Sequence, residues 1–161
     1  MALKEYTVAD GVLIEDLLQY GLDHIATAEH LFKQSASYYD GAGYLTHMGF
    51  ELLLKAWLLR QIGSFPATHK LVDLLKLIKA NNPTLEFTKT SGQTIAYLEV
   101  YAELRYPNRN LPIEIGSDQW SAIASFRDEL WRQMPSEFMA IIKAIDPLKK
   151  GGRVLMQKKI E

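Results

Sequence analysis

Residues 44–62, YLTHMGFELLLKAWLLRQI, form a segment that is apolar on almost every side of the helix that they predict. Each residue advances a helix by about 100°, so the apolar side chains spread over two broad faces. Only His47, Glu51 and Lys55 are left as a narrow polar stripe. A helix of this kind is packed on several sides, so we expect it at the centre of its domain. Glu51 and Lys55 are one turn apart in the favourable order and are expected to pair, because an unpaired charge beside packed surface is costly.

The rest of the chain predicts four further helices and no strand. The five expected helices run from about residue 12 to 37, 44 to 62, 68 to 81, 90 to 105 and 117 to 145. Tyr38–Gly43 predicts a break after the first helix, because its two glycines accept positive φ. Pro135 removes a backbone hydrogen bond and predicts a kink in the last helix, or two abutting helices. Short connections between amphipathic helices predict an all-α, five-helix up-and-down bundle.

Composition favours one soluble domain spanning residues 1–161. The chain is 48% hydrophobic and 23% charged, with a formal net charge of −1, so it is not a nucleic-acid binder through overall charge. Charge is unevenly spread: Lys4 is the only cation through residue 32, and five cations against Glu161 follow Pro147. We expect a loose basic C-terminal tail from about residue 147. The tail is either a solvated end or an arm that contacts phosphate or a partner.

Several classes of protein find no support in the sequence. There is no cysteine, no signal-peptide pattern and no apolar run of the roughly 20 residues that cross a membrane, so we expect a cytoplasmic protein without membrane contact. No cofactor or metal site is expected, since zinc signatures, Gly-rich phosphate loops, Gly-x-Ser-x-Gly and inward Glu-x-x-His pairs are all missing. His47 and Glu51 are four residues apart, and we interpret them as structural rather than as metal ligands.

Two polar clusters are candidate ligand sites. In the first, Arg105, Tyr106, Arg109 and Asn110 lie within six residues at the end of the fourth helix. Arginine forks suit phosphate oxygens and tyrosine stacks on bases, although cations at a helix end also satisfy its last carbonyls.

The second cluster is Thr68-His69-Lys70 at the start of the third helix. Free N–H groups at a helix N-terminus attract anions, so His69 and Lys70 are candidates to bind a phosphate. The alternative is that Thr68 caps the helix and His69 packs against a neighbouring helix.

Taken together, these pieces resemble the HEPN domain family, the nucleotide-binding domain of higher eukaryotes and prokaryotes. The matching residues are Tyr44, His47, Glu51 and Lys55-Ala56, then Thr68-His69-Lys70-Leu71 with Leu74-Leu75, then Arg105-Tyr106-Pro107. Their order and spacing agree from about residue 20 to residue 145. The resemblance implies a five-helix up-and-down bundle that commonly forms a homodimer, and often works beside a nucleotidyltransferase in toxin–antitoxin or defence systems.

Many members of that family are metal-independent ribonucleases, whose signature is an arginine followed after four to six residues by a histidine. The histidine acts as general base or acid, and the arginine stabilises phosphate charge. This sequence departs from the pattern, because no histidine follows His69. Counted from Arg109, Glu114 stands where the histidine belongs, and a carboxylate repels the phosphate that it must approach.

Three hypotheses follow. The first is a nucleotide- or RNA-binding protein that lacks the usual Arg…His site, with the two clusters as its ligand residues. The second is a ribonuclease toxin in which His69 or Glu114 takes the missing role. The third is a protein-interaction module that uses exposed faces of the first and last helices, including Trp120 and Trp131.

Overall fold

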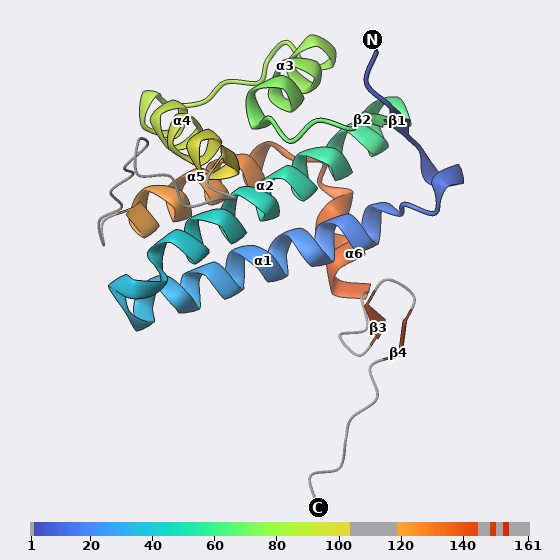
Figure 1. Ribbon diagram of the computed structural model, residues 1–161. Coiled ribbons are helices and arrows are strands. Elements are labelled where there is room, and N and C mark those ends of the chain that lie inside the picture. The colour runs from blue at the N-terminus through green and yellow to red at the C-terminus, as the bar shows by residue number, and fades with distance from the viewer. Residues whose placement is uncertain (1, 104–118, 145–148, 151–152, 155–161) are drawn as a thin grey trace, which may run out of the picture.

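Helix α2 (Tyr39–Ile62) runs through the middle of the computed structural model, with the other helices arranged around it (Figure 1). The structure describes residues 2–103, 119–144, 149–150 and 153–154. Buried positions occur all round α2, from Ala42 near its start to Leu59 near its end. The predicted central position of this helix is therefore confirmed. Gly63, with a φ of 79°, ends the helix in the left-handed conformation that suits glycine.

The other described helices are α1 (Ile14–Gln34), α3 (Leu71–Asn81), α4 (Lys89–Glu103), α5 (Gln119–Gln133) and α6 (Glu137–Ala144), with short 3-10 turns at Val8–Asp10 and Ala36–Tyr38. A mostly helical architecture is thus confirmed. The five-helix count and the kink at Pro135 are not confirmed. The structure has the alternative of two abutting helices, because α5 and α6 are separate helices on either side of residues 134–136. No described helix is both long enough and apolar enough to cross a lipid bilayer.

Four two-residue strands were not predicted. β1 (Glu5–Tyr6) pairs antiparallel with β2 (Phe65–Pro66), and β3 (Lys149–Lys150) pairs antiparallel with β4 (Arg153–Val154). Runs of two residues are too short to give a period-2 pattern in the sequence. The first pair joins the N-terminal segment to the chain just after α2.

Helices α1 and α2 form an antiparallel hairpin, in which the two helices lie side by side along their length (Figure 1). Two glycines allow the close approach. A Cβ on Gly49 would lie 2.6 Å from Ile25 Cγ1 and 2.8 Å from the Gly21 carbonyl oxygen. Real Cβ atoms do not approach other atoms so closely, so glycine is required where the helices cross.

The predicted break at Tyr38–Gly43 is wrong. Helix α2 already begins at Tyr39, and the turn from α1 occupies only Ser35 and the 3-10 residues after it. Gly43 serves packing rather than a turn, because a Cβ there would lie 2.5 Å from the ring of Tyr101 in α4. Sequence alone does not distinguish a glycine that bends a chain from one that admits a neighbour.

The spacing of Thr90 and Gln93 predicts a capping box at the start of α4, but the start of this helix is held by α5 instead. Glu129 Oε1 accepts a hydrogen bond from the Thr88 N–H at 2.8 Å, and the other carboxylate oxygen accepts from the hydroxyls of Thr88 and Ser91. Thr88 Oγ1 in turn accepts from the Ser91 N–H. Burial alone would raise the pKa of Glu129, but these hydrogen bonds outweigh it and lower the pKa below its ordinary value.

Candidate functional site

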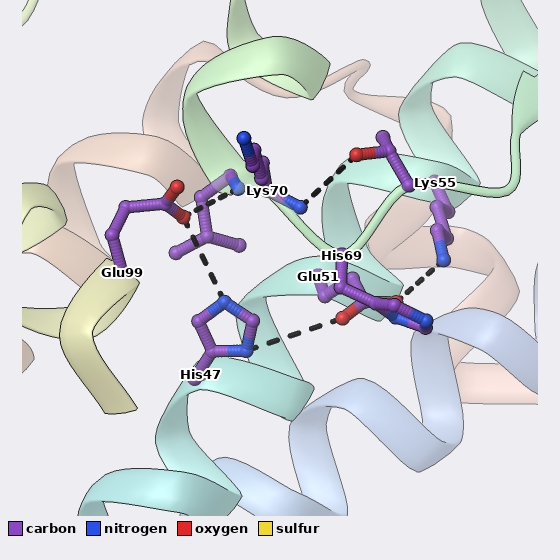
Figure 2. A network of polar contacts seen from close by, with 8 residues as sticks. His47, Glu51, Lys55, His69, Lys70 and Glu99 are labelled. Carbon is purple, nitrogen blue, oxygen red and sulfur yellow. Dashed lines mark hydrogen bonds and ion pairs between the residues drawn. The ribbon is translucent and has the colours of Figure 1, made fainter. Parts of the chain in front are cut away.

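The polar stripe of α2 lies where the start of α3 and the last turns of α4 pack against it (Figure 2). His47, Glu51 and Lys55 are buried, at 2%, 7% and 7% exposure. These side chains meet residues from two other elements, His69 in the segment before α3 and Glu99 in α4. We call His47, Glu51, Lys55, His69 and Glu99 the polar network.

Glu51 and Lys55 pair as predicted. Lys55 Nζ donates to Glu51 Oε1 at 2.5 Å, and each side chain is only 9% exposed. Lys55 Nζ also lies 5.5 Å from the ring centroid of Phe65. A buried pair of this kind is retained only when further hydrogen bonds offset the cost of taking both charges out of water.

His69 supplies that further contact. Its Nδ1 lies 3.1 Å from Glu51 Oε1, so one carboxylate oxygen faces both an ammonium and an imidazole. The His69 side chain is nevertheless 59% exposed, which leaves much of the ring in contact with solvent. A carboxylate that orients an accessible imidazole is the arrangement used to position a general base or acid.

His47 links the network to α4. Its Nδ1 is 4.0 Å from Glu51 Oε2 and its Nε2 is 3.7 Å from Glu99 Oε1, distances longer than those of a hydrogen bond. Glu99 Oε1 also accepts the Leu71 N–H at 2.6 Å. Burial raises the pKa of Glu99; the hydrogen bond from Leu71 opposes this, and the nearby Asp73 charge adds to it.

The hydrogen bond from Leu71 bears on the anion site expected at the start of α3. Lys70, not Thr68, is the N-cap residue, and Thr68 Oγ1 accepts the Lys70 N–H at 3.2 Å. The next N–H, that of Leu71, is already bonded to the Glu99 carboxylate. The helix end thus has an anionic partner within the protein, while the side chains of His69 and Lys70 remain exposed.

The other predicted ligand residues, Arg105, Tyr106, Arg109 and Asn110, lie outside the described residues, as does Glu114. Their role in binding phosphate stays a prediction. Within the described residues, α4 ends at Glu103, two residues before Arg105.

Glu99 was missed by the sequence reasoning, although a signal existed. On its own helix the positions three and four residues away are Ala96, Ala102, Ile95 and Glu103, so no cation is available one turn off. A carboxylate without a local partner beside an apolar face requires one from another element.

The two tryptophans proposed for an interaction surface are packed rather than freely exposed. Trp120 lies 5.9 Å from Phe32 between ring centroids, and Trp131 Nε1 donates to Met139 Sδ. Both are partly buried against the core. Within the described ranges, no cluster of three or more histidine, aspartate or glutamate side chains is arranged to hold a metal ion.

Comparison with known families gives a match over most of the chain. The model of the HEPN domain matches residues 14–128, which cover α1 to α4, the polar network and the Arg105–Asn110 segment. No curated protein and no solved structure matches the chain.

Proposed function

The chain belongs to the HEPN domain family, and from this premise we propose that it is a nucleotide- or RNA-binding protein without the usual Arg…His ribonuclease site. Arg105 and Arg109 bind phosphate, Tyr106 stacks or hydrogen-bonds, and Asn110 assists. His69 and Lys70 contribute from the segment before α3. The protein acts as a homodimer in a toxin–antitoxin or defence system, beside a nucleotidyltransferase partner.

One contact carries this proposal, the hydrogen bond from the Leu71 N–H to Glu99 Oε1. It joins the last turns of α4 to the first residue of α3. The arginine cluster follows α4 directly in sequence, and His69 and Lys70 directly precede α3. The arginine cluster and the His69-Lys70 pair are more than 30 residues apart in the chain, yet each is next in sequence to one of two helices, α4 and α3, that contact each other. Cations occur in both segments, and Lys70 is exposed, which favours an anionic ligand.

The test is binding of a labelled single-stranded RNA and of ATP, measured by fluorescence anisotropy and calorimetry at low salt. We expect Arg105→Ala with Arg109→Ala to weaken RNA affinity by about tenfold or more, and to reduce the dependence of affinity on salt. The matched control is Arg132→Ala with Lys143→Ala, which removes the same charge from exposed positions on α5 and α6. Equal affinity of the wild type and the arginine variant for both ligands would refute the proposal.

A second function, metal-independent cleavage of RNA, is favoured by one observation. His69 is exposed and its Nδ1 is 3.1 Å from a buried carboxylate, as a proton-transferring imidazole requires. The assay is RNA cleavage in the presence of EDTA by the wild type, by His69→Gln and by the control His30→Gln, which changes an exposed histidine of α1. Activity lost only in His69→Gln supports this function. If the wild-type protein leaves RNA intact both in the presence of EDTA and in the presence of added metal ions, this second function is excluded.

The homodimer and the partner protein are tested separately. Light scattering gives the oligomeric state of the purified chain. Co-expression with a nucleotidyltransferase encoded by a neighbouring gene, followed by gel filtration, tests the pair. Rescue of growth by that enzyme in cells that express this chain supports a toxin–antitoxin role, and harmless expression of the chain alone argues against it.

A further inference from the structure

A groove with a volume of about 400 Å³ lies between α3, the segment that follows it and the start of α4, and none of the residues of the polar network line it. It is lined by Val72, Leu75, Lys76, Lys79, Leu85, Phe87, Thr88, Gly92 and Ile95. The walls are mostly apolar, and the two lysines stand three residues apart on α3. We propose that this groove binds an acidic amphipathic helix of a partner protein.

The apolar lining decides what enters the groove. Apart from the two lysines, Thr88 is the one polar side chain among the described residues that line the groove. The N–H and the hydroxyl of Thr88 already donate hydrogen bonds to Glu129, so they are not free to bind a ligand. A nucleobase placed here would leave the donors and acceptors of its edge without partners, which is costly. Aliphatic or aromatic side chains lose nothing of this kind and gain from burial.

The walls also select the backbone conformation of the occupant. Two walls of the groove are helices, whose N–H and C=O groups are bonded within each helix. In the third wall, the segment after α3, the N–H groups of Leu85, Glu86 and Thr88 are already hydrogen-bonded within the protein. An extended peptide would find no free strand edge to pair with. A helix satisfies its own backbone and presents apolar side chains at positions i, i+3, i+4 and i+7, so it suits a groove of this kind.

Charge gives the sign of the partner. Lys76 and Lys79 are exposed, and within the described residues neither makes an ion pair. No carboxylate lines the groove. Residues three apart on a helix lie on the same side, so the two ammonium groups flank the groove together. Aspartate or glutamate beside the apolar face of the partner helix would neutralise them.

Gly92 provides a specific way to close the groove. A Cβ built on it meets nothing within 4 Å, and its φ lies outside the positive range, so a larger side chain is accommodated without backbone strain. Gly41 in α2 has the same two properties and does not line the groove. Gly92→Leu therefore fills the groove, and Gly41→Leu is its matched control.

The experiment selects binders from a displayed library of helix-forming 18-residue peptides, with randomised apolar and charged positions, against the wild-type protein. We expect the selected peptides to be acidic. Gly92→Leu should weaken their binding by about tenfold or more, whereas Gly41→Leu leaves it unchanged. Lys76→Glu with Lys79→Glu should reverse the preference towards basic peptides, and Lys33→Glu with Lys143→Glu should not.

Three results would overturn the proposal. The first is enrichment of peptides without acidic residues, or of peptides that still bind Gly92→Leu. The second is failure to select any peptide while decyl phosphate binds with the same sensitivity to Gly92→Leu, which assigns the groove to a small anionic amphiphile. The third is a change of oligomeric state in Gly92→Leu by light scattering, which assigns it to a second copy of this chain.

Discussion

Two glycines of α2 should respond in opposite directions to the same substitution. At Gly49, a Cβ would meet Ile25 Cγ1 at 2.6 Å and the Gly21 carbonyl at 2.8 Å. The second contact is with backbone, so relief requires α1 to move away from α2. At Gly41 a Cβ meets nothing within 4 Å. Gly49→Ala and Gly41→Ala therefore compare overpacking with helix propensity inside one helix.

The magnitudes follow from the two effects. Overpacking a close helix crossing costs about 3 kcal/mol, at the upper end of the usual range, because backbone must shift. Replacing glycine by alanine within a helix returns about 1 kcal/mol. We expect Gly49→Ala to lower the free energy of unfolding by about 2 kcal/mol, and the melting temperature by about 4–8 °C. Gly41→Ala should raise the free energy of unfolding by about 0.5–1 kcal/mol.

The assay is urea unfolding followed by circular dichroism, with thermal melts as a second measurement. Equal m-values across the variants would show that the midpoints report stability rather than a changed unfolded state. The reasoning is wrong if Gly49→Ala is as stable as the wild type, or if Gly41→Ala is destabilised to the same degree. The first result would mean that α1 and α2 do not approach closely at Gly21 and Gly49, and the second that the space around Gly41 is not open.

Three further predictions concern buried and half-buried polar groups. Hydrogen bonds outweigh the effect of burial on Glu129 and hold its pKa below 4.5, so the stability that this carboxylate gives the fold is present above pH 4.5 and is lost as the pH falls through the folded-state pKa. Burial raises the pKa of Glu99, so the free-energy cost of ionising Glu99 in the folded protein appears as the pH rises above 4.5. Urea unfolding from pH 3 to 7 should therefore show Glu129→Gln less stable than the wild type only above the folded-state pKa of Glu129. The stability of Glu99→Gln should rise relative to the wild type as the pH rises. Plots of unfolding free energy against pH that run parallel for the wild type and both variants would contradict this. Glu51→Gln should lower the free energy of unfolding by about 3 kcal/mol, because it leaves Lys55 buried without its carboxylate partner. In a double-mutant cycle, Glu51→Gln combined with Lys55→Met should be destabilised by less than the sum of the two single variants. Burial raises the pKa of Tyr101, whose hydroxyl has no hydrogen-bond partner among the described residues, so Tyr101→Phe should leave the melting temperature unchanged or raise it, and a clear drop would reveal a partner.

The sequence predicted the helical fold well because its strongest signal was also the strongest physical constraint. A segment that is apolar all round, as in residues 44–62, has few solutions other than a central helix. The same pattern isolated the three polar residues of the stripe, and the i, i+4 rule paired Glu51 with Lys55. These inferences needed only contacts within one helix.

The errors arose where a residue's role depends on a distant element. Gly43 was interpreted as part of a turn, although it admits the ring of Tyr101, almost 60 residues away in the chain. The start of α4 was assigned to a local capping box, although Glu129 of α5 holds it. Glu99 was absent from the predicted site because both of its partners lie on other helices. Local spacing carries no information on such pairings.

The geometry of the polar network determines which of its residues can report on function. Glu51 binds Lys55 and His69 through the same oxygen, so its replacement disturbs a buried ion pair and the segment before α3 together. Loss of activity in Glu51→Gln would therefore reflect loss of fold as readily as loss of chemistry. His69 is different, because its side chain is 59% exposed and a glutamine amide in its place can still donate a hydrogen bond but cannot transfer a proton at neutral pH. A His69→Gln variant with an unchanged melting temperature and altered RNA cleavage would separate the chemical role from the structural one, and an unchanged activity would confine the network to holding α3 on α2.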